Sequence, residues 1–324
     1  ETMKGNWRNM PVSDAYEPGS VMKIVTISAA LDAGLVSPDT PIDCGHGVYS
    51  APELKGWDLH DCSTRLGVQP VSGVLSHSSN IGTYKIARML GAEGVRNAME
   101  RFGFGRATGI GLTQESAGSL KPVEDWNAVN LSRGCIGYFI TATALQQVMA
   151  YAAIANRGIL LQPRLIDRVV YSDGRVQTFP PQPVGRACCE RTAEKVTAML
   201  EGVVKEGSGK RAAIEGVRVA GKTGTRNVYD PHRNAKGEVI GYRRDQQVVS
   251  FAGFAPVEAP RVACVVMVNN PKVNSPELQQ GGLVAAPIFS ELVTAALDYL
   301  EVRLDPHASV STTAFAPSPG GTSP

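Results

Sequence analysis

The chain has 324 residues, of which 43% are hydrophobic, and its 32 basic and 30 acidic side chains leave a formal net charge of +2. This length and apolar content suffice for one large domain with a buried core. The small net charge argues against a nucleic-acid partner, and we interpret the basic cluster Tyr242-Arg243-Arg244 as a solvated loop. The N-terminus lacks a signal-peptide pattern and no apolar run is expected to reach the roughly 18 residues of a membrane span, so the chain is predicted to be soluble.

The first two thirds of the chain are predicted to be mainly helical. Apolar spacing and helix-stop signals indicate helices over residues 20–35, 72–77, 81–90, 95–102, 145–156 and 191–205. The helix over 145–156 is expected to be the most buried of them. Residues 41–67 are rich in Gly, Asp and aromatic side chains and are interpreted as an irregular connection.

The pattern then changes to β-branched runs separated by turn signals. Residues 217–228, 248–255 and 262–268 predict an antiparallel three-stranded meander, with a long charged hairpin loop over 226–244. A terminal helix over 288–302 is expected to lie on this sheet, and residues 304–324, rich in Ser, Thr and Pro, are expected to be a disordered tail. The fold class is therefore α/β of the α+β type, an antiparallel sheet flanked by helices, in one domain over residues 1–303.

Three short motifs occur in a fixed order along the chain. They are Ser20-Val-Met-Lys23, Ser78-Ser79-Asn80 and Lys222-Thr223-Gly224-Thr225. Each motif alone has a plain structural explanation: a helix cap with a solvated lysine, an ordinary turn, and a strand end with a turn glycine. Their joint occurrence in this order favours an acyl-transfer site instead.

The first motif supplies a nucleophile and its base. A serine hydroxyl is a weak nucleophile until a neighbouring base takes its proton. Residues three apart share one face of a helix, so the Lys23 amine is expected beside the Ser20 hydroxyl. An ammonium cannot accept a proton, and we therefore expect burial and a second cation, Lys222, to keep Lys23 neutral.

The other two motifs are assigned the remaining roles. Ser78 is expected to pass a proton to the leaving amine, and Asn80 to hold the peptide amide of the substrate. The segment from Lys222 to Thr225 suits an edge strand that lines a cleft, with Gly224 leaving room for a substrate backbone. The backbone N–H groups of Ser20 and Thr225 are predicted to form an oxyanion hole.

Metal and cofactor sites are not expected. The six cysteines lack metal-type Cys-x-x-Cys pairs. Cys44 and Cys62 are either free or bridged, depending on the redox compartment. His77 stands directly before the second motif, but with a lysine already available it is not our candidate base.

With these motifs the chain resembles the penicilloyl-serine transferases, and most closely the transpeptidase domain of class B penicillin-binding proteins of the cell-division type. The resemblance covers nearly all of residues 7–302. It is carried by the three motifs and by flanking segments, among them Tyr16-Glu17-Pro18-Gly19-Ser20, Phe102-Gly103-Phe104-Gly105, Glu115-Ser116-Ala117-Gly118 and Ser250-Phe251-Ala252-Gly253-Phe254-Ala255-Pro256.

The resemblance implies a fold, an activity and a cellular setting. The fold would be that of serine β-lactamases and penicillin-binding transpeptidases, with an all-helical subdomain. The activity would be D,D-transpeptidation of peptidoglycan stem peptides through a Ser20 acyl-enzyme, inhibited covalently by β-lactams. A membrane glycan polymerase and division-complex proteins would be partners of the full-length protein, on the periplasmic face of the membrane and held there by an N-terminal anchor.

Only 19 residues precede Ser20. Members of this family carry an anchor, a non-catalytic domain and the first strands of the sheet before the nucleophile. We therefore expect the chain to be an N-terminally truncated piece whose sheet lacks outer strands and an edge cover.

Three other functions stay open on the sequence. A D,D-carboxypeptidase differs only in that water replaces the acceptor amine. A serine β-lactamase shares the motifs but needs a dedicated base for its hydrolytic water, and the interval from Ser20 to Lys222 is long for that class. We find no such carboxylate near Ser20, because Glu17 is interpreted as a favourable charge at the helix entrance. A non-catalytic penicillin-binding sensor has no need of Lys23 and Asn80, yet both are present.

Overall fold

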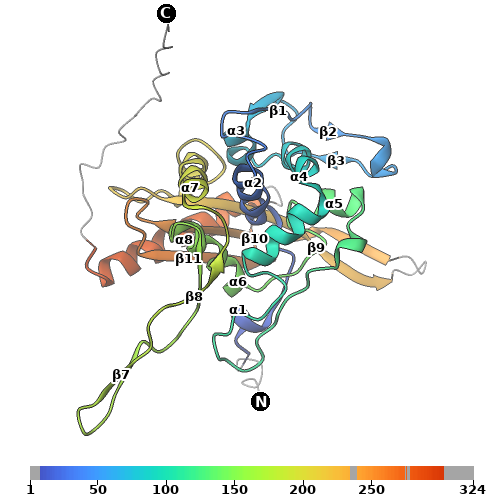
Figure 1. Cartoon of the computed structure of the whole chain (residues 1–324). Helices are drawn as coiled ribbons and strands as arrows, with labels where there is room; N and C mark the ends of the chain where they lie inside the picture. Colours follow the sequence, from blue (N-terminus) through green and yellow to red (C-terminus); the bar gives the residue numbers. More distant parts are fainter. Residues whose placement is uncertain (1–7, 234–238, 274, 276–277, 303–324) are drawn as a thin grey trace, which may run out of the picture.

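The computed structural model describes residues 8–233, 239–273, 275 and 278–302. A three-stranded antiparallel sheet lies beneath a layer of helices, and a two-stranded arm projects from the body (Figure 1). The helices are α1 (Met10–Ser13), α2 (Lys23–Asp32), α3 (Val71–Ser76), α4 (Asn80–Arg101), α5 (Ala128–Gly134), α6 (Ala144–Ala155), α7 (Glu190–Lys205) and α8 (Gly281–Tyr299). Short 3-10 turns are η2 (Gly19–Met22), η3 (Pro52–Leu54), η4 (Val123–Asp125) and η5 (Lys210–Ala212).

Helix α2 lies at the centre of the helical layer, against α4 and α7. Nine of its ten residues are buried, compared with six of twelve in α6. The prediction that the helix over 145–156 is the most buried was therefore wrong. A helix whose residues are apolar or small all round can be enclosed on every side, and α2 is such a helix.

The central sheet follows the predicted meander, in the order β11 (Val262–Asn269), β10 (Val239–Ala255), β9 (Ala220–Arg233). Among the described strands, β9 pairs with β10 alone and so forms an edge, as predicted for the strand that carries the third motif. The predicted loop over 226–244 was wrong for most of its length: β9 runs on to Arg233 and β10 begins at Val239, so a long ribbon extends beyond the sheet.

The two faces of the sheet contact different cores. Because successive strand residues point to opposite faces, Phe251 packs on Phe289 of α8 with ring centroids 4.7 Å apart. Ala252 and Phe254 belong instead to the larger core formed with α2, α4, α6 and α7. The terminal helix thus lies on the sheet as predicted, although it begins seven residues earlier, at Gly281.

Short strand pairs replace the irregular connection predicted over 41–67. Strand β1 (Pro41–Asp43) pairs with β4 (Val68–Pro70), and β2 (Val48–Tyr49) pairs with β3 (Leu59–His60). Two further pairs lie between α6 and α7; they are β5 (Ile159–Gln162) with β8 (Gln182–Arg186) and β6 (Arg168–Val170) with β7 (Val176–Thr178), the projecting arm.

Helix α8 also has the length and apolar composition of a membrane span. The prediction that no apolar segment is long enough for a membrane span was therefore wrong, by length and composition. Its residues Ala285, Phe289, Val293 and Leu297 are buried against the sheet. A core helix can have the same length and composition as a membrane span. Two of the predicted helices, over 81–90 and 95–102, form one element, α4, with non-helical backbone angles at Gly91.

Candidate acyl-transfer site

Two glycines allow the turn before the nucleophile. Gly19 has a φ of +63°, a left-handed conformation that favours glycine, and its N–H donates to the carbonyl of Gly137 at 3.0 Å. A Cβ on Gly137 would stand 2.2 Å from the carbonyl oxygen of Gly19. Gly137 is therefore required for the close approach of the two segments, and Gly19 for its left-handed backbone.

The nucleophile and its candidate base lie on one turn of helix. Ser20 falls in η2, and the N–H of Lys23 donates to the carbonyl of Ser20, which is the i to i+3 bond of a 3-10 turn. Both side chains therefore share a face, as predicted. Ser20 is half-buried, whereas Lys23 is fully buried.

The second motif surrounds the Lys23 amine. Ser78 links α3 to α4 with a φ of +59°, and Ser79 caps α4 by accepting a bond from the Gly82 N–H. The Lys23 Nζ donates to the Ser78 carbonyl at 2.5 Å, to the Ser78 Oγ at 3.1 Å and to the Asn80 Oδ1 at 2.7 Å. Among the described residues, none of its hydrogen bonds goes to Ser20. The first two motifs are thus joined through the amine.

The third motif lies along edge strand β9. Lys222 is fully buried, and its Nζ donates to the carbonyl of Thr223 at 3.0 Å and to the Oγ1 of Thr223 at 3.2 Å. The same hydroxyl lies 2.7 Å from the Oγ of Ser208. Thr225 is exposed, and its Oγ1 accepts the N–H of Gly281 at 3.0 Å.

Gly224 has a different reason to be glycine from the one predicted. A Cβ at this position would stand 2.3 Å from the Ser250 Oγ on β10 and 3.2 Å from the Cγ1 of Val21. The missing side chain therefore makes room first for the Ser250 hydroxyl on β10 and then for Val21 of η2, beside Ser20, and it does not open space for a substrate.

Burial dominates the electrostatics of the two lysines. Desolvation disfavours an ammonium and lowers the pKa of Lys23 to about 8, while the Asp61 carboxylate acts in the opposite direction. Burial also lowers the pKa of Lys222 well below its ordinary value, and the positive charge of Lys23 adds to this effect. With a pKa of about 8, roughly a tenth of Lys23 is neutral at pH 7, far more than for an ordinary lysine, and this fraction can act as a general base.

Asp61 is a site residue that the sequence interpretation missed. Its Oδ2 accepts the Ser79 hydroxyl at 2.6 Å, and its Oδ1 accepts the backbone N–H groups of Asn80 and, at 3.2 Å, of Ile81. It lies in a segment interpreted as irregular, 18 residues before Ser79 in the sequence. No local pattern links an isolated aspartate to a helix so far along the chain.

Glu17 and Tyr242 form a second contact that was missed. Glu17 stands two residues before η2, at the helix entrance as interpreted, and its Oε1 also accepts the Phe139 N–H at 3.1 Å and the Tyr242 hydroxyl at 2.9 Å. Tyr242 in turn accepts a bond from Arg133 at 2.8 Å. The interpretation of Tyr242 as part of a solvated loop was therefore wrong.

The remaining candidates lie apart from this chemistry. His77 is exposed at the end of α3. Cys44 is buried and Cys62 exposed, and both are free thiols. Within the described part of the chain, no group of three or more His, Cys, Asp or Glu side chains is arranged to hold a metal ion.

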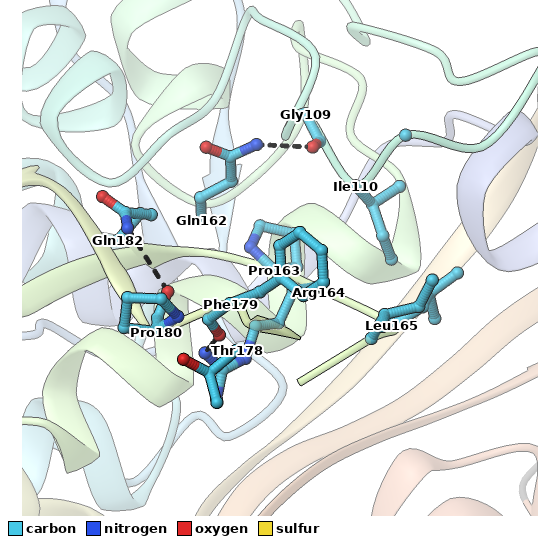
Figure 2. A pocket seen from close by; sticks show the side chains of 12 residues that line it. Gly109, Ile110, Gln162, Pro163, Arg164, Leu165, Thr178, Phe179, Pro180 and Gln182 are labelled. Atoms are coloured by element: carbon cyan, nitrogen blue, oxygen red, sulfur yellow. Dashed lines mark hydrogen bonds between the residues drawn. The ribbon is translucent and has the colours of Figure 1, made fainter. Parts of the chain in front are cut away.

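A cavity of about 450 Å³ lies away from the three motifs, at the base of the β6–β7 arm. Figure 2 shows Gln162 bonded to the Gly109 carbonyl, and Gln182 to the Pro180 carbonyl, at its wall. Apolar side chains, including Leu165 and Phe179, line much of it. No motif residue is among them, so the cavity is not the acyl-transfer site.

Comparison with known proteins places this geometry in a family. Residues 1–294 match the family described as the penicillin binding protein transpeptidase domain. The chain is 34% identical to the penicillin-binding protein PbpB of Mycolicibacterium smegmatis over 311 residues, which cover 92% of this chain and 45% of that protein. It is 31% identical to the peptidoglycan D,D-transpeptidase FtsI of Escherichia coli over 306 residues, 94% of this chain and 47% of that protein. The chain thus spans a little under half the length of these relatives.

Solved structures of penicillin-binding proteins have the same fold as this chain. The transpeptidase domain of penicillin-binding protein 3 from Burkholderia pseudomallei superposes with a TM-score of 0.79 at 33% identity, covering 92% of this chain and 83% of that one. Penicillin-binding protein 3 of Mycobacterium tuberculosis, complexed with ampicillin, gives a TM-score of 0.80 at 34% identity, covering 93% of this chain and 66% of that one. The fold, the order of the motifs and these matches together show that the chain belongs to the penicillin-binding protein transpeptidase domain family.

Proposed function

We propose that this chain is the catalytic domain of a peptidoglycan D,D-transpeptidase that acts through a Ser20 acyl-enzyme. The observation that carries the proposal is the burial of Lys23, its pKa of about 8, and its position one 3-10 turn from Ser20 with its amine bonded to Ser78 and Asn80. This is the arrangement of an activated serine nucleophile.

In the proposed reaction, neutral Lys23 takes the proton of the Ser20 hydroxyl as the oxygen attacks the carbonyl carbon of the penultimate D-Ala. The backbone N–H groups of Ser20 and Thr225 hold the oxyanion. As the C–N bond breaks, the proton passes through the Ser78 hydroxyl, which lies 3.1 Å from the Lys23 Nζ, to the leaving D-Ala amine. An acceptor amine of a second stem peptide then attacks the Ser20 ester, loses its proton to Lys23 and releases the serine.

The remaining motif residues are assigned to substrate binding. Asn80 holds the substrate's peptide amide, and the edge of β9 from Thr223 to Thr225 is free to pair with an extended peptide, since β10 occupies only its other side. Lys222 is assigned to the substrate carboxylate: its side chain is fully buried and its pKa is lowered in the free site, and a bound carboxylate would favour its protonated form. β-Lactams are proposed to acylate Ser20 as substrate analogues, and the resulting penicilloyl ester is not passed on to an acceptor amine.

The setting of the reaction is also a proposal. The relatives named FtsI, and a stage V sporulation protein D of Bacillus subtilis that is 35% identical over 302 residues, support septal or related cell-wall synthesis. We place the activity outside the cytoplasmic membrane, where peptidoglycan is cross-linked, with an anchor, a glycan polymerase and division-complex proteins belonging to the full-length protein.

Mass spectrometry after brief exposure to benzylpenicillin tests the proposal. We expect one penicilloyl group per chain, on the peptide that contains Ser20, and none in Ser20→Ala. The matched control is Ser13→Ala, a half-buried serine that bonds Asp14 outside the motifs, and this variant should be acylated like the wild type. An unmodified chain, or an adduct on another serine, contradicts the assignment.

A further inference from the structure

Asp61 occupies a position between two parts of the site. It follows β3, and its carboxylate accepts three bonds from the start of α4: the Ser79 hydroxyl, the Asn80 N–H and the Ile81 N–H. Next to it in sequence, the carbonyl of His60 accepts the Asn80 Nδ2 at 2.7 Å. Both ends of Asn80, its backbone and its side chain, are therefore held by residues 60 and 61.

Holding Asn80 also orients the amine of the base. The Asn80 side chain donates through Nδ2 to His60, so its Oδ1 is left to accept the Lys23 Nζ at 2.7 Å. Ser79, which comes directly before Asn80, bonds Asp61 through its hydroxyl. Ser78 supplies the other two acceptors of the amine. A shift of this junction would move all three partners of Lys23 together.

The carboxylate is also the formal negative charge that acts on Lys23. The other groups that interact electrostatically with Lys23 are the thiols of Cys62, Cys135 and Cys44. Lys23 in turn interacts with Lys222. A carboxylate near a buried ammonium favours its protonated form, so it opposes the effect of burial.

We propose that Asp61 is a positioning residue of the acyl-transfer site, which fixes the Ser78-Ser79-Asn80 junction around Lys23 and sets the protonation of that base by its charge. The proposal rests on the proposed function, in which Lys23 is the base of Ser20 acylation. It predicts two separable effects, one of geometry and one of charge.

The pH dependence of Ser20 acylation separates these effects. With the wild type, the second-order rate of acylation by a fluorescent penicillin should rise with pH around a midpoint near 8, as Lys23 loses its proton. Asp61→Asn removes the charge, so the ammonium is less stable and the midpoint should move to lower pH, by about one unit. The limiting rate should fall as well, because an amide cannot accept all three bonds in the same way.

Asp32→Asn is the matched control. The Asp32 Oδ1 also accepts the backbone N–H at the start of a helix, that of Cys189 before α7, at 2.9 Å, but Asp32 is not among the groups that act on Lys23. This variant should lose some stability and keep the midpoint of the wild type. An Asp61→Asn profile with an unchanged midpoint overturns the role of the charge.

Two further variants keep the test decisive where Asp61→Asn does not fold. Asp61→Glu retains the charge and displaces the bonds, and Ser79→Ala removes one bond and retains the charge. Both should acylate several-fold more slowly with a midpoint near that of the wild type, and acylation at the wild-type rate in either overturns the positioning role. A wild-type chain that is not acylated at Ser20 would instead refute the proposed function, which distinguishes the two failures.

Discussion

The hydroxyl of Tyr242 donates to the Glu17 carboxylate at 2.9 Å, which joins strand β10 to the residue three positions before Ser20. Glu17 also accepts the Phe139 N–H, so one carboxylate connects three segments that are far apart in the sequence. Gly19, between Glu17 and Ser20, adopts its left-handed turn against Gly137 in the same region. The orientation of the nucleophile therefore depends on tertiary contacts outside the three motifs.

Tyr242→Phe should weaken this connection. It removes two hydrogen bonds with charged groups, the one to Glu17 and the one from Arg133, and such bonds contribute roughly 1.5–3 kcal/mol each. We expect a lower melting temperature and Ser20 acylation that is slower by several-fold, measured by thermal unfolding and by fluorescent penicillin. Tyr171→Phe is the control, because that hydroxyl bonds Gln177 on the exposed arm and should affect neither quantity. Equal behaviour of the two variants would show that the Glu17 contact is dispensable.

Gly224→Ala should distort the nucleophile turn. The new Cβ would stand 2.3 Å from the Ser250 Oγ and 3.2 Å from the Val21 side chain, and overpacking of this kind costs typically 1–3 kcal/mol. We expect slower acylation and lower stability, with partial recovery in the double variant Gly224→Ala/Ser250→Ala. Gly185→Ala, at a strand position with no atom within 4 Å of the new Cβ, is the control. Normal acylation by Gly224→Ala would contradict the packing argument.

The two lysines should fail in different ways. Lys23→Ala removes the base and should slow acylation by about 10²–10⁴-fold, the usual contribution of general-base catalysis. Lys222→Ala should mainly weaken the binding of β-lactams that carry a carboxylate. Acylation rates measured over a range of β-lactam concentrations separate a lower maximal rate from weaker binding. If Lys23→Ala acylates normally, the base has been misassigned.

The buried Lys23 should make stability depend on pH in a specific direction. Its pKa is about 8 when folded and 10.5 when unfolded, so between these values the unfolded chain binds more protons and the free energy of unfolding rises with pH. The free energy of unfolding should rise by about 3 kcal/mol in total, beginning near pH 8 and ending near pH 10.5. Lys23→Met lacks this rise, so urea unfolding should show the wild type gaining on the variant from pH 8 to 10. A constant difference would mean that the folded pKa is not lowered.

The penicilloyl-enzyme should persist for many minutes to hours. Two carboxylates close to the motifs are both engaged, Glu17 with Tyr242 and Phe139, and Asp61 with the start of α4. Without a positioned base, hydrolysis loses the roughly 10²–10⁴-fold contribution of general-base catalysis. Release of hydrolysed antibiotic after a single pulse measures this. Multiple turnovers per second would favour a β-lactamase.

The sequence by itself determined the coarse fold and predicted the chemistry of the site. Ser20 and Lys23 share a face because three-residue spacing on a helical turn requires it, and the β-branched runs specify the meander through their period of two. These are local relationships, encoded within a few residues, so a single chain reveals them. The order of the three motifs predicted the site, because a set of residue types that serve one reaction can be recognised even when its members are far apart in the sequence.

Only the tertiary structure decided what surrounds the motifs. Asp61, Glu17 and Tyr242 carry no local signal, since a carboxylate or a tyrosine in an irregular segment has no fixed partner until the chain folds. The burial that lowers the pKa of Lys23 also depends on α2 being enclosed on all sides, and no helical period distinguishes that from burial of one face. The reason Gly224 is glycine likewise lies in its contacts with Ser250 on β10 and Val21 of η2, which only packing defines.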